Sequence, residues 1–170
     1  MLTELPFDFP GRVFRSSMPF GPFDRQGSHW QAYQEQGVEL VVVLTEPQEF
    51  LVYAGRDLPE FYRSRGLEVI QVSIPDHGLP PDPERFQEVL TRVEQAGEEG
   101  RNIAVHCLAG IGRTGTFLAC LAAGNLSLSG AEAVDWVRKY IPSALETAPQ
   151  VNFVKTFVSR NSSRGSSGSN

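Results

Sequence analysis

The sequence lacks the features that mark secreted, metal-binding or membrane-spanning chains. Cys107 and Cys120 are the only cysteines, too few for a disulfide framework or a tetrahedral metal site. No apolar run is long enough to cross a bilayer, and the first residues carry neither the basic region nor the apolar stretch of a secretory signal. We therefore expect a chain that works in the reducing cytoplasm.

Positive charge is also scarce. The 15 Lys and Arg residues are outnumbered by 20 Asp and Glu, which gives a net charge of −5, and Lys139 and Lys155 are the only lysines. This balance excludes a broad basic surface, so we expect no nucleic-acid partner and no stable membrane association. One local pocket for an anion remains compatible with it.

What the sequence does have is an ordinary globular composition, 41% hydrophobic and 21% charged over 170 residues. We expect a single domain over residues 1–158. Residues 159–170 are mostly Ser, Asn, Gly and Arg. Because such a composition buries little apolar surface, the sequence predicts a disordered tail there.

Short apolar segments alternate with helical patterns. Strands are predicted at residues 12–15, 38–44, 68–74 and 103–106, and the last three are almost continuously apolar, as in a parallel sheet buried on both faces. Helices are predicted at residues 28–36, 83–99 and 115–123, at 129–140 after a Ser129–Glu132 capping box, and at 147–157 after a Thr147–Gln150 capping box. This order predicts an α/β fold with a mostly parallel sheet.

The most informative segment is residues 106–115, His-Cys-Leu-Ala-Gly-Ile-Gly-Arg-Thr-Gly, between a predicted strand and a predicted helix. Glycines allow a tight loop whose backbone N–H groups converge on one point. The helix N-terminus adds about half a positive charge, and Arg113 offers a two-pronged donor to phosphate oxygens. The segment therefore predicts a dianion pocket formed by Leu108, Ala109, Gly110, Ile111, Gly112 and Arg113.

The same electrostatic field acts on Cys107. A free thiol has a pKa of about 8.5, whereas thiolates at helix N-termini or beside cations titrate at roughly 3.5–7.5. We therefore expect Cys107 to be a thiolate at neutral pH and a nucleophile aimed at phosphorus. Thr114 is a candidate donor to the sulfur, and His106 is expected to brace the loop rather than to act as a base. Cys120, inside the apolar helix, is expected to be a core residue.

Other interpretations of this segment are weaker. A lone Cys-x5-Arg arises often by chance, and a glycine-rich loop after a strand can bind a nucleotide, but neither GxxxxGK[ST] nor GxGxxG is present. The full combination of His-Cys, two spaced glycines, Arg-Thr-Gly and strand-to-helix placement favours catalysis.

HCLAGIGRTG resembles the phosphate-binding loop of the cysteine-dependent protein tyrosine phosphatase superfamily, especially its compact dual-specificity branch with small archaeal and bacterial members. The resemblance covers residues 12–158. It implies Cys107 as nucleophile, Arg113 as phosphate clamp, and a twisted sheet with helices on both faces. It also implies a general acid, an aspartate on a mobile loop upstream of the cysteine.

Asp76 is the candidate for this acid. It lies 31 residues before Cys107, in an Asp-His-x-x-Pro segment that resembles the acid loop of several such phosphatases. A carboxylic acid there supplies the proton that a departing alkoxide or phenoxide needs. Two alternatives are that this segment is only a turn, and that Asp82 is the acid, although Asp82 can instead cap the following helix.

Gln150 lies in a segment that resembles the one in which related phosphatases place a glutamine beside the active site. It would then position water for the second step, and its alternative role is as capping-box partner of Thr147. Arg15, Ser16 and Glu46 are candidates for the pocket rim or ordinary residues of their segments.

These expectations describe a hydrolase of phosphate monoesters that needs no metal or cofactor and works through a phosphocysteine intermediate. Its expected partner is a phosphorylated protein, with phosphotyrosine as substrate and phosphoserine or phosphothreonine as further candidates, and the chain is expected to be a cytoplasmic monomer. The alternatives are a phosphoinositide or RNA 5′-phosphate phosphatase, or a phosphate-binding module without turnover. Lipid-selective relatives carry lysines in the loop where this chain has Leu108 and Ile111.

Overall fold

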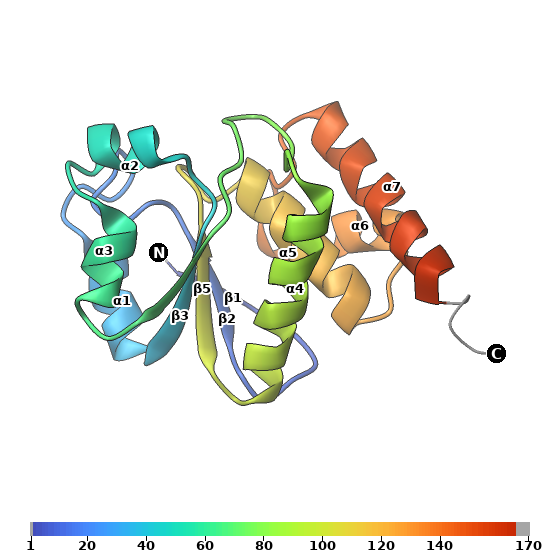
Figure 1. Ribbon diagram of the computed structural model, residues 1–170, viewed down its shortest axis with the longest axis horizontal. Coiled ribbons are helices and arrows are strands. Elements are labelled where there is room, and N and C mark those ends of the chain that lie inside the picture. The colour runs from blue at the N-terminus through green and yellow to red at the C-terminus, as the bar shows by residue number, and fades with distance from the viewer. Residues whose placement is uncertain (1, 166–170) are drawn as a thin grey trace.

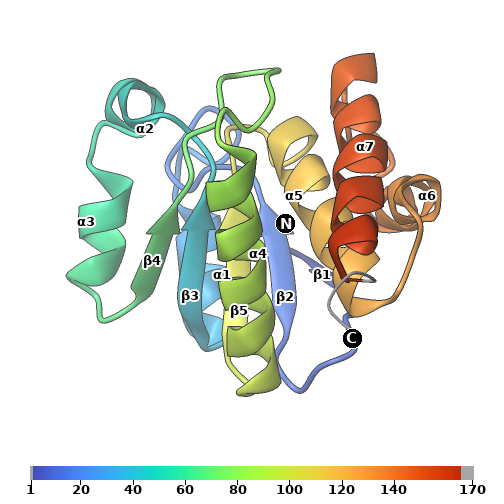
Figure 2. The same cartoon turned by 45° about the vertical axis from the view of Figure 1, so that its right-hand side comes forward.

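The computed structural model describes residues 2–165, which fold into a five-stranded sheet between two groups of helices (Figures 1 and 2). In chain order the elements are β1 (Thr3–Leu5), β2 (Val13–Ser16), α1 (Ser28–Glu35), β3 (Val38–Val43), α2 (Pro47–Tyr53), α3 (Leu58–Arg63), β4 (Glu68–Gln71), α4 (Pro83–Glu98), β5 (Asn102–His106), α5 (Gly112–Asn125), α6 (Gly130–Tyr140) and α7 (Ala148–Gly165).

The sheet has the strand order β1-β2-β5-β3-β4. β2, β5, β3 and β4 run parallel, and β1 is antiparallel to β2. The predicted mostly parallel sheet is therefore confirmed. The antiparallel edge strand β1 is a difference, because its three residues, Thr-Glu-Leu, carry no strand-like pattern.

Two apolar clusters cover the two faces of the sheet. One packs α4, α5, α6 and α7 against side chains such as Val13, Val42 and Val105. The other packs α1, α2 and α3 against the alternate residues of the same strands, among them Phe14 and Val41. In Figure 1 the first three helices lie to the left of the sheet and the last four to the right. The predicted cover of helices on both faces is confirmed.

Local capping signals fix the helix ends. The Ser129–Glu132 capping box opens α6 as predicted, and the Asp82 side chain caps α4 by accepting from Arg85 N at 3.0 Å. The sequence pattern does not predict α2 and α3. Both are short, and both begin with a proline in the first turn behind an acidic N-cap, Glu46 and Asp57 respectively.

The predicted disordered tail differs from the structure. α7 continues to Gly165 instead of ending near residue 157, and residues 166–170 lie outside the described residues. Two kinds of contact support the extension. Ser159 and Ser162 donate side-chain hydrogen bonds to carbonyls one turn back, and Asn161 Nδ2 donates to Gln87 Oε1 of α4. A polar composition thus continues a helix here because α4 supplies a partner.

Among residues 2–165, no helix is both long enough and apolar enough to cross a bilayer.

Candidate active site

The candidate site lies at the carboxyl ends of the parallel strands. α2 follows β3, the Asp76 loop joins β4 to α4, and the Cys107 loop joins β5 to α5; all three stand at the upper end of the sheet in Figure 1. Open parallel sheets bind their ligands at this end. Three segments that are far apart in sequence therefore meet where the predicted anion pocket begins.

The loop after β5 packs against the end of β2 and the residues that follow it. Met18 N donates to Leu108 O at 3.0 Å. Gly110 adopts a φ of +74°, and a Cβ at this position would lie 2.2 Å from Ser16 O. Only glycine combines this left-handed backbone with so close an approach, which is the physical reason for glycine at this position of the motif.

The backbone of this loop presents hydrogen-bond donors without protein acceptors. Gly110 N donates to Cys107 Sγ at 3.3 Å. Among the described residues, no acceptor is recorded for the backbone N–H groups of Leu108, Ala109, Ile111, Gly112 and Arg113. The last two also begin α5, where N–H groups have no intrahelical partner and the helix dipole is positive. These unpaired donors are compatible with the predicted cradle of N–H groups, which stays a prediction.

Cys107 itself is almost completely buried, with 3% of its surface exposed. The expected hydrogen bond from Thr114 to the sulfur is not among those recorded within residues 2–165. The Thr114 hydroxyl is buried, and no described residue accepts or donates to it. A buried hydroxyl normally has a hydrogen-bond partner. An anion bound in the adjacent loop would be such a partner for Thr114.

His106 braces the loop as a neutral imidazole. Its Nδ1 lies 3.1 Å from Cys107 O, which can only accept, so Nδ1 carries the proton. Its Nε2, 3.1 Å from the Tyr62 hydroxyl, therefore accepts. Complete burial lowers the pKa of His106 to about 4, although the hydrogen bond to Cys107 opposes the shift. These contacts agree with the expected bracing role.

Arg113 is the most strongly held side chain of the site. Its guanidinium is 2% exposed and forms a bidentate pair with Glu49 of α2, at 2.7 and 2.8 Å. It also donates to Ile74 O at 3.0 Å and to Asp76 Oδ1 at 3.1 Å. Burial alone would lower the pKa of Arg113, but the hydrogen bond to Glu49 and the nearby negative charges outweigh it and raise the pKa.

Sequence reasoning missed Glu49, and it also missed Glu146, whose Oε2 lies beside Gly112 and 3.9 Å from His77 Nδ1. Glu49 lies 64 positions from Arg113 in a helix that the apolar pattern does not predict. A signal was present: Glu46-Pro-Gln-Glu49 is an acidic variant of a capping box, in which the Glu49 side chain accepts from Glu46 N at 2.9 Å. Glu46, a candidate for the pocket rim, caps α2 through this box.

Asp76 lies on a tight turn beside Arg113. Gly78 N donates to Pro75 O at 2.8 Å, and His77 has a left-handed φ of +56°. Asp76 Oδ1 accepts from His77 N at 3.0 Å as well as from Arg113, and its side chain is 54% exposed. The turn and the acid-loop interpretations are therefore compatible. Asp82, the alternative acid, has its side chain engaged as the cap of α4.

Gln150 is buried where α7 meets both loops. It forms the predicted capping box with Thr147, with both hydrogen bonds at 3.3 Å. Its Nε2 also donates to Gly78 O of the Asp76 turn at 3.5 Å. A Cβ on Gly112 would lie 3.1 Å from this same nitrogen. Both roles left open by the sequence, the cap and the place beside the site, are thus compatible with one position.

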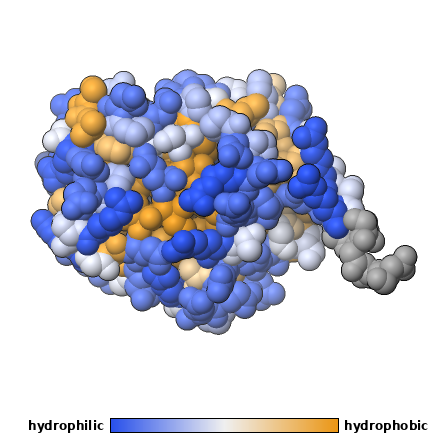
Figure 3. All heavy atoms as spheres, viewed as in Figure 1, coloured by the Kyte–Doolittle hydropathy of each residue, from blue (hydrophilic) through white to orange (hydrophobic). Residues whose placement is uncertain are grey.

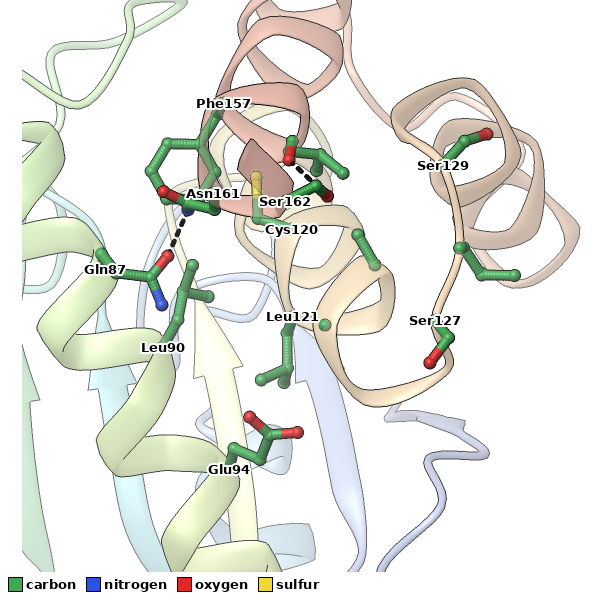
Figure 4. Close-up of a pocket in the computed structure, with 14 residues that line it drawn as sticks. Gln87, Leu90, Glu94, Cys120, Leu121, Ser127, Ser129, Phe157, Asn161 and Ser162 are labelled. Atoms are coloured by element: carbon green, nitrogen blue, oxygen red, sulfur yellow. Dashed lines mark hydrogen bonds between the residues drawn. The ribbon is translucent and has the colours of Figure 1, made fainter. Parts of the chain in front are cut away.

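Cys120 lies elsewhere, in the wall of a cavity of about 520 Å³ between α4, α5 and α7. Figure 4 shows its sulfur pointing toward α7, which carries Phe157, Asn161 and Ser162. Complete burial raises the pKa of the Cys120 thiol far above its usual value. Cys120 is therefore a core residue, as predicted.

Exposed apolar side chains flank the candidate site. Leu51, Val52 and Tyr53 are exposed on α2, and Leu79 is exposed on the Asp76 loop. The space-filling view has apolar colour at its upper left, over α2, and further apolar areas in the centre and at the upper right of the same face (Figure 3). Within residues 2–165 no cluster of three or more His, Cys, Asp or Glu side chains could hold a metal ion.

Comparison with known proteins identifies the family. The model of a family described as "Polymorphic toxin system, DSP-PTPase phosphatase" matches residues 23–125, a span that contains Asp76, Cys107 and Arg113. The chain belongs to this family. The resemblance to compact dual-specificity-like members of the protein tyrosine phosphatase superfamily is thereby confirmed.

Curated relatives agree with this assignment. Tyrosine-protein phosphatase 1 of Caenorhabditis elegans is 29% identical over 131 residues, which cover 71% of this chain and 13% of that protein. Protein-tyrosine-phosphatase PTP1 of Arabidopsis thaliana is 40% identical over 86 residues, which cover 46% of this chain and 25% of that protein. The chain thus spans a quarter or less of the length of these relatives.

Solved structures match almost the whole chain. Tk-PTP in its active form is 31% identical with a TM-score of 0.75, and the match covers 93% of this chain and 97% of that one. Kinase associated phosphatase has a TM-score of 0.83 at 20% identity and 94% coverage of both chains, a likeness of fold. The dual-specificity phosphatase-like α/β fold is therefore confirmed.

Proposed function

We propose that the chain hydrolyses phosphate monoesters on proteins, with phosphotyrosine as its main substrate, through a phosphocysteine intermediate on Cys107. The observation that carries this proposal is the Cys107 sulfur, which accepts from Gly110 N at 3.3 Å in a loop where no acceptor is recorded for the neighbouring backbone N–H groups among the described residues. The Arg113 guanidinium lies near enough for the negative charge of Cys107 to favour a raised pKa of Arg113. The names of the relatives, tyrosine-protein and dual-specificity phosphatases, support the same activity.

Substrate binding first rearranges Arg113. Its Nη2 donates both to Glu49 and to Asp76 in the described structure. A phosphate dianion that takes hydrogen bonds from Nη2 therefore displaces Asp76, whereas Glu49, held on both guanidinium nitrogens, stays and keeps the fork oriented. The displaced Asp76 carboxyl is then free to act on the leaving oxygen.

In the first chemical step, the Cys107 thiolate attacks phosphorus in line. An S–P bond forms, the bond from phosphorus to the ester oxygen breaks, and Asp76 gives its proton to that oxygen. The loop N–H groups and Arg113 stabilise the charge on the equatorial phosphate oxygens.

In the second step, ionised Asp76 takes a proton from a water molecule whose oxygen attacks phosphorus. The S–P bond breaks, inorganic phosphate leaves, and Cys107 is again a thiolate. Gln150, beside Gly112 and the Asp76 turn, is the side chain we assign to positioning this water.

The apolar side chains on both sides of the site suit a protein substrate, because residues that flank a phosphorylated side chain contact the rim. Both cysteines are free, and a catalytic thiolate persists in a reducing compartment, so we place the activity in the cytoplasm. We further propose that the chain acts as a monomer, which the molar mass by light scattering tests.

A phosphoinositide is the second candidate substrate. PTPMT1, a structure with a TM-score of 0.74 at 19% identity, has been solved in complex with PI(5)P. That likeness is one of fold, and this chain has Leu108 and Ile111 where lipid-selective relatives carry lysines. RNA 5′-phosphate and binding without turnover remain as further alternatives.

Release of inorganic phosphate separates these candidates. Phosphotyrosine peptides, phosphoserine and phosphothreonine peptides, phosphatidylinositol phosphate vesicles and a 5′-phosphorylated RNA oligonucleotide are compared at equal concentration. We expect the phosphotyrosine peptides to be hydrolysed fastest and Cys107→Ser to abolish every rate. Faster release from vesicles or RNA would replace the protein substrate, and no release from any of them would leave only binding.

A further inference from the structure

Arg15 occupies a position in β2 between Thr3 of the edge strand β1 and the apolar residues of the sheet interior. It pairs in register with Val105 of β5, and Val13, two residues earlier, points to the same face of the sheet. Val13 and Val105 are fully buried in the cluster beneath α4 to α7. A partly buried arginine in this row breaks the apolar pattern of the face, and such local exceptions are expected near functional sites.

The contacts of Arg15 lead to the phosphate-binding loop. Its Nη1 donates a long hydrogen bond of 3.5 Å to Gly110 O. Its Nε is buried, and no described residue accepts from it. Burial lowers the pKa of Arg15, and the negative charge of Cys107 opposes this shift. The guanidinium therefore lies in the field of the sulfur, on the opposite side of the Gly110 peptide from the loop interior.

The peptide that joins Gly110 to Ile111 decides where one N–H of the cradle points. Gly110 N faces Cys107 Sγ, whereas Gly110 O faces Arg15. The described chain has no cis peptide bond, and in a trans peptide the C=O and the following N–H point in opposite directions. A carbonyl turned toward Arg15 therefore turns the Ile111 N–H away from Arg15.

This peptide needs an external restraint. Gly110 and Gly112 flank it closely, and glycine gives the backbone more rotational freedom than any other residue. Among the described residues, Arg15 is the one recorded donor to Gly110 O. Without that donor, rotation of the peptide would aim a carbonyl oxygen instead of an N–H at the phosphate.

We propose that Arg15 is a positioning residue of the phosphate-binding loop, which holds the Gly110 carbonyl so that the Ile111 N–H points at the phosphate oxygens. The proposal rests on the proposed phosphatase function. Because a correctly aimed N–H matters most when charge develops on phosphorus, Arg15 acts on the transition state more than on substrate binding.

The test compares Arg15→Met with Arg12→Met. Methionine suits the apolar row beside Val13 and Val105, and Arg12, at the start of the same strand, is exposed and pairs with Glu4. The measurements are kcat and KM for p-nitrophenyl phosphate, the affinity for vanadate, and the melting temperature. We expect Arg15→Met to lower kcat and the vanadate affinity together by about tenfold, with a smaller change in KM. Arg12→Met is expected to leave kcat, KM and vanadate affinity unchanged.

Arg15→Lys supplies the rescue, since it keeps the charge and one donor and should recover part of the lost kcat. An Arg15→Met protein that folds and retains the parental kcat and vanadate affinity overturns the proposal. If Arg15→Met does not fold, Arg15→Gln takes its place with the same expected direction and the same contrary result. Failure of the proposed function is distinguishable, because it would appear in the unmodified chain as no hydrolysis or as hydrolysis that survives Cys107→Ser.

Discussion

The two cysteines of this chain are almost equally buried, and yet we propose opposite chemistry for them. Cys107 is 3% exposed and Cys120 is 5% exposed, and both are free. Cys107 ends a strand and receives a backbone N–H on its sulfur. Cys120 lies inside α5, where burial raises its pKa. Exposure therefore does not distinguish a nucleophile from a core residue; the donors and cations around the sulfur do.

The difference follows from where each residue falls relative to one helix. Cys107 precedes α5 by five residues, on the side where the N–H groups and the positive end of the dipole are found. Cys120 follows the helix start and has its polar backbone satisfied within the helix. In our proposal the N-terminus of α5 faces the reactive thiol, whereas the interior of the same helix buries the other. The predictions below remove the contributions to the proposed site one at a time.

The largest expected effect is that of exchanging the cysteines for serine. Cys107→Ser should lower the hydrolysis of p-nitrophenyl phosphate by about 10⁴-fold or more, because serine is a far weaker nucleophile at neutral pH. Cys120→Ser is the matched control and should retain the parental rate, measured per folded protein by circular dichroism. Equal losses in both variants would contradict the distinction between them.

Replacing Arg113 should have the next largest effect. Arg113→Lys keeps a positive charge but loses the bidentate geometry and the pairing with Glu49. We expect kcat to fall by roughly 10³-fold, as for the loss of an oxyanion donor. Steady-state kinetics at a fixed pH measures it, and a lysine variant with nearly parental kcat would show that charge alone suffices.

Asp76→Asn tests the proton donor that accompanies Cys107. We expect kcat for a phosphotyrosine peptide to fall by about 10²-fold, with a smaller loss for p-nitrophenyl phosphate, whose leaving group needs less protonation. The parental enzyme should show a bell-shaped pH profile with an acidic optimum. Asp82→Asn serves as the control because Asp82 caps α4. A flat parental profile between about pH 5 and 8 would remove Asp76 from the mechanism.

The sequence predicted the parts of this molecule that depend on neighbours in the chain. Residues 106–115 carry the loop, its glycines, its cation and its sulfur within ten positions, and Gly110 N donates to the Cys107 sulfur. The roles of these residues stay predictions. The buried strands β3 and β5 follow from their apolar runs. A strand at β4 was also predicted, but β4 ends at Gln71 and is a partly exposed edge strand. The α4 and α6 helices follow from their stripes and caps.

What could not be predicted depends on partners distant in sequence. Glu49 approaches Arg113 only because β3 and β5 lie side by side in the sheet. No local sequence pattern predicts that these two strands pair. β1 exists through its register with β2, not through its own three residues. The extension of α7 rests on the contact between Asn161 and Gln87 of another helix. Each miss is a tertiary contact that overrides weak local preference.

A smaller effect concerns stability, through the imidazole that braces the Cys107 carbonyl. The pKa of His106 is about 4 in the folded chain and about 6.5 when unfolded. Between these values the unfolded chain binds the extra proton, so the contribution of His106 is complete above about pH 6.5 and is lost as the pH falls toward 4. We expect this loss to reach on the order of 3 kcal/mol.

Urea unfolding at several pH values, with His106→Asn beside the parental chain, measures this contribution. Carboxylates with a lowered pKa, such as Glu68, become protonated at low pH in both proteins. Their contributions to the free energy of unfolding therefore cancel in the comparison. The parental chain should therefore lose more stability than the variant between about pH 6.5 and 4. Parallel losses would mean that His106 is not held neutral in the folded state.

The phosphorylated intermediate itself gives the most direct test. The chain is mixed with p-nitrophenyl phosphate, quenched in acid during turnover, digested and analysed by mass spectrometry, with Asp76→Asn in parallel because it should slow the second step. We predict one added phosphoryl group on the peptide that contains Cys107, stable in acid and absent from the Cys120 peptide. Continued hydrolysis with no phosphoryl group on Cys107, or with the group on another residue, would contradict the account.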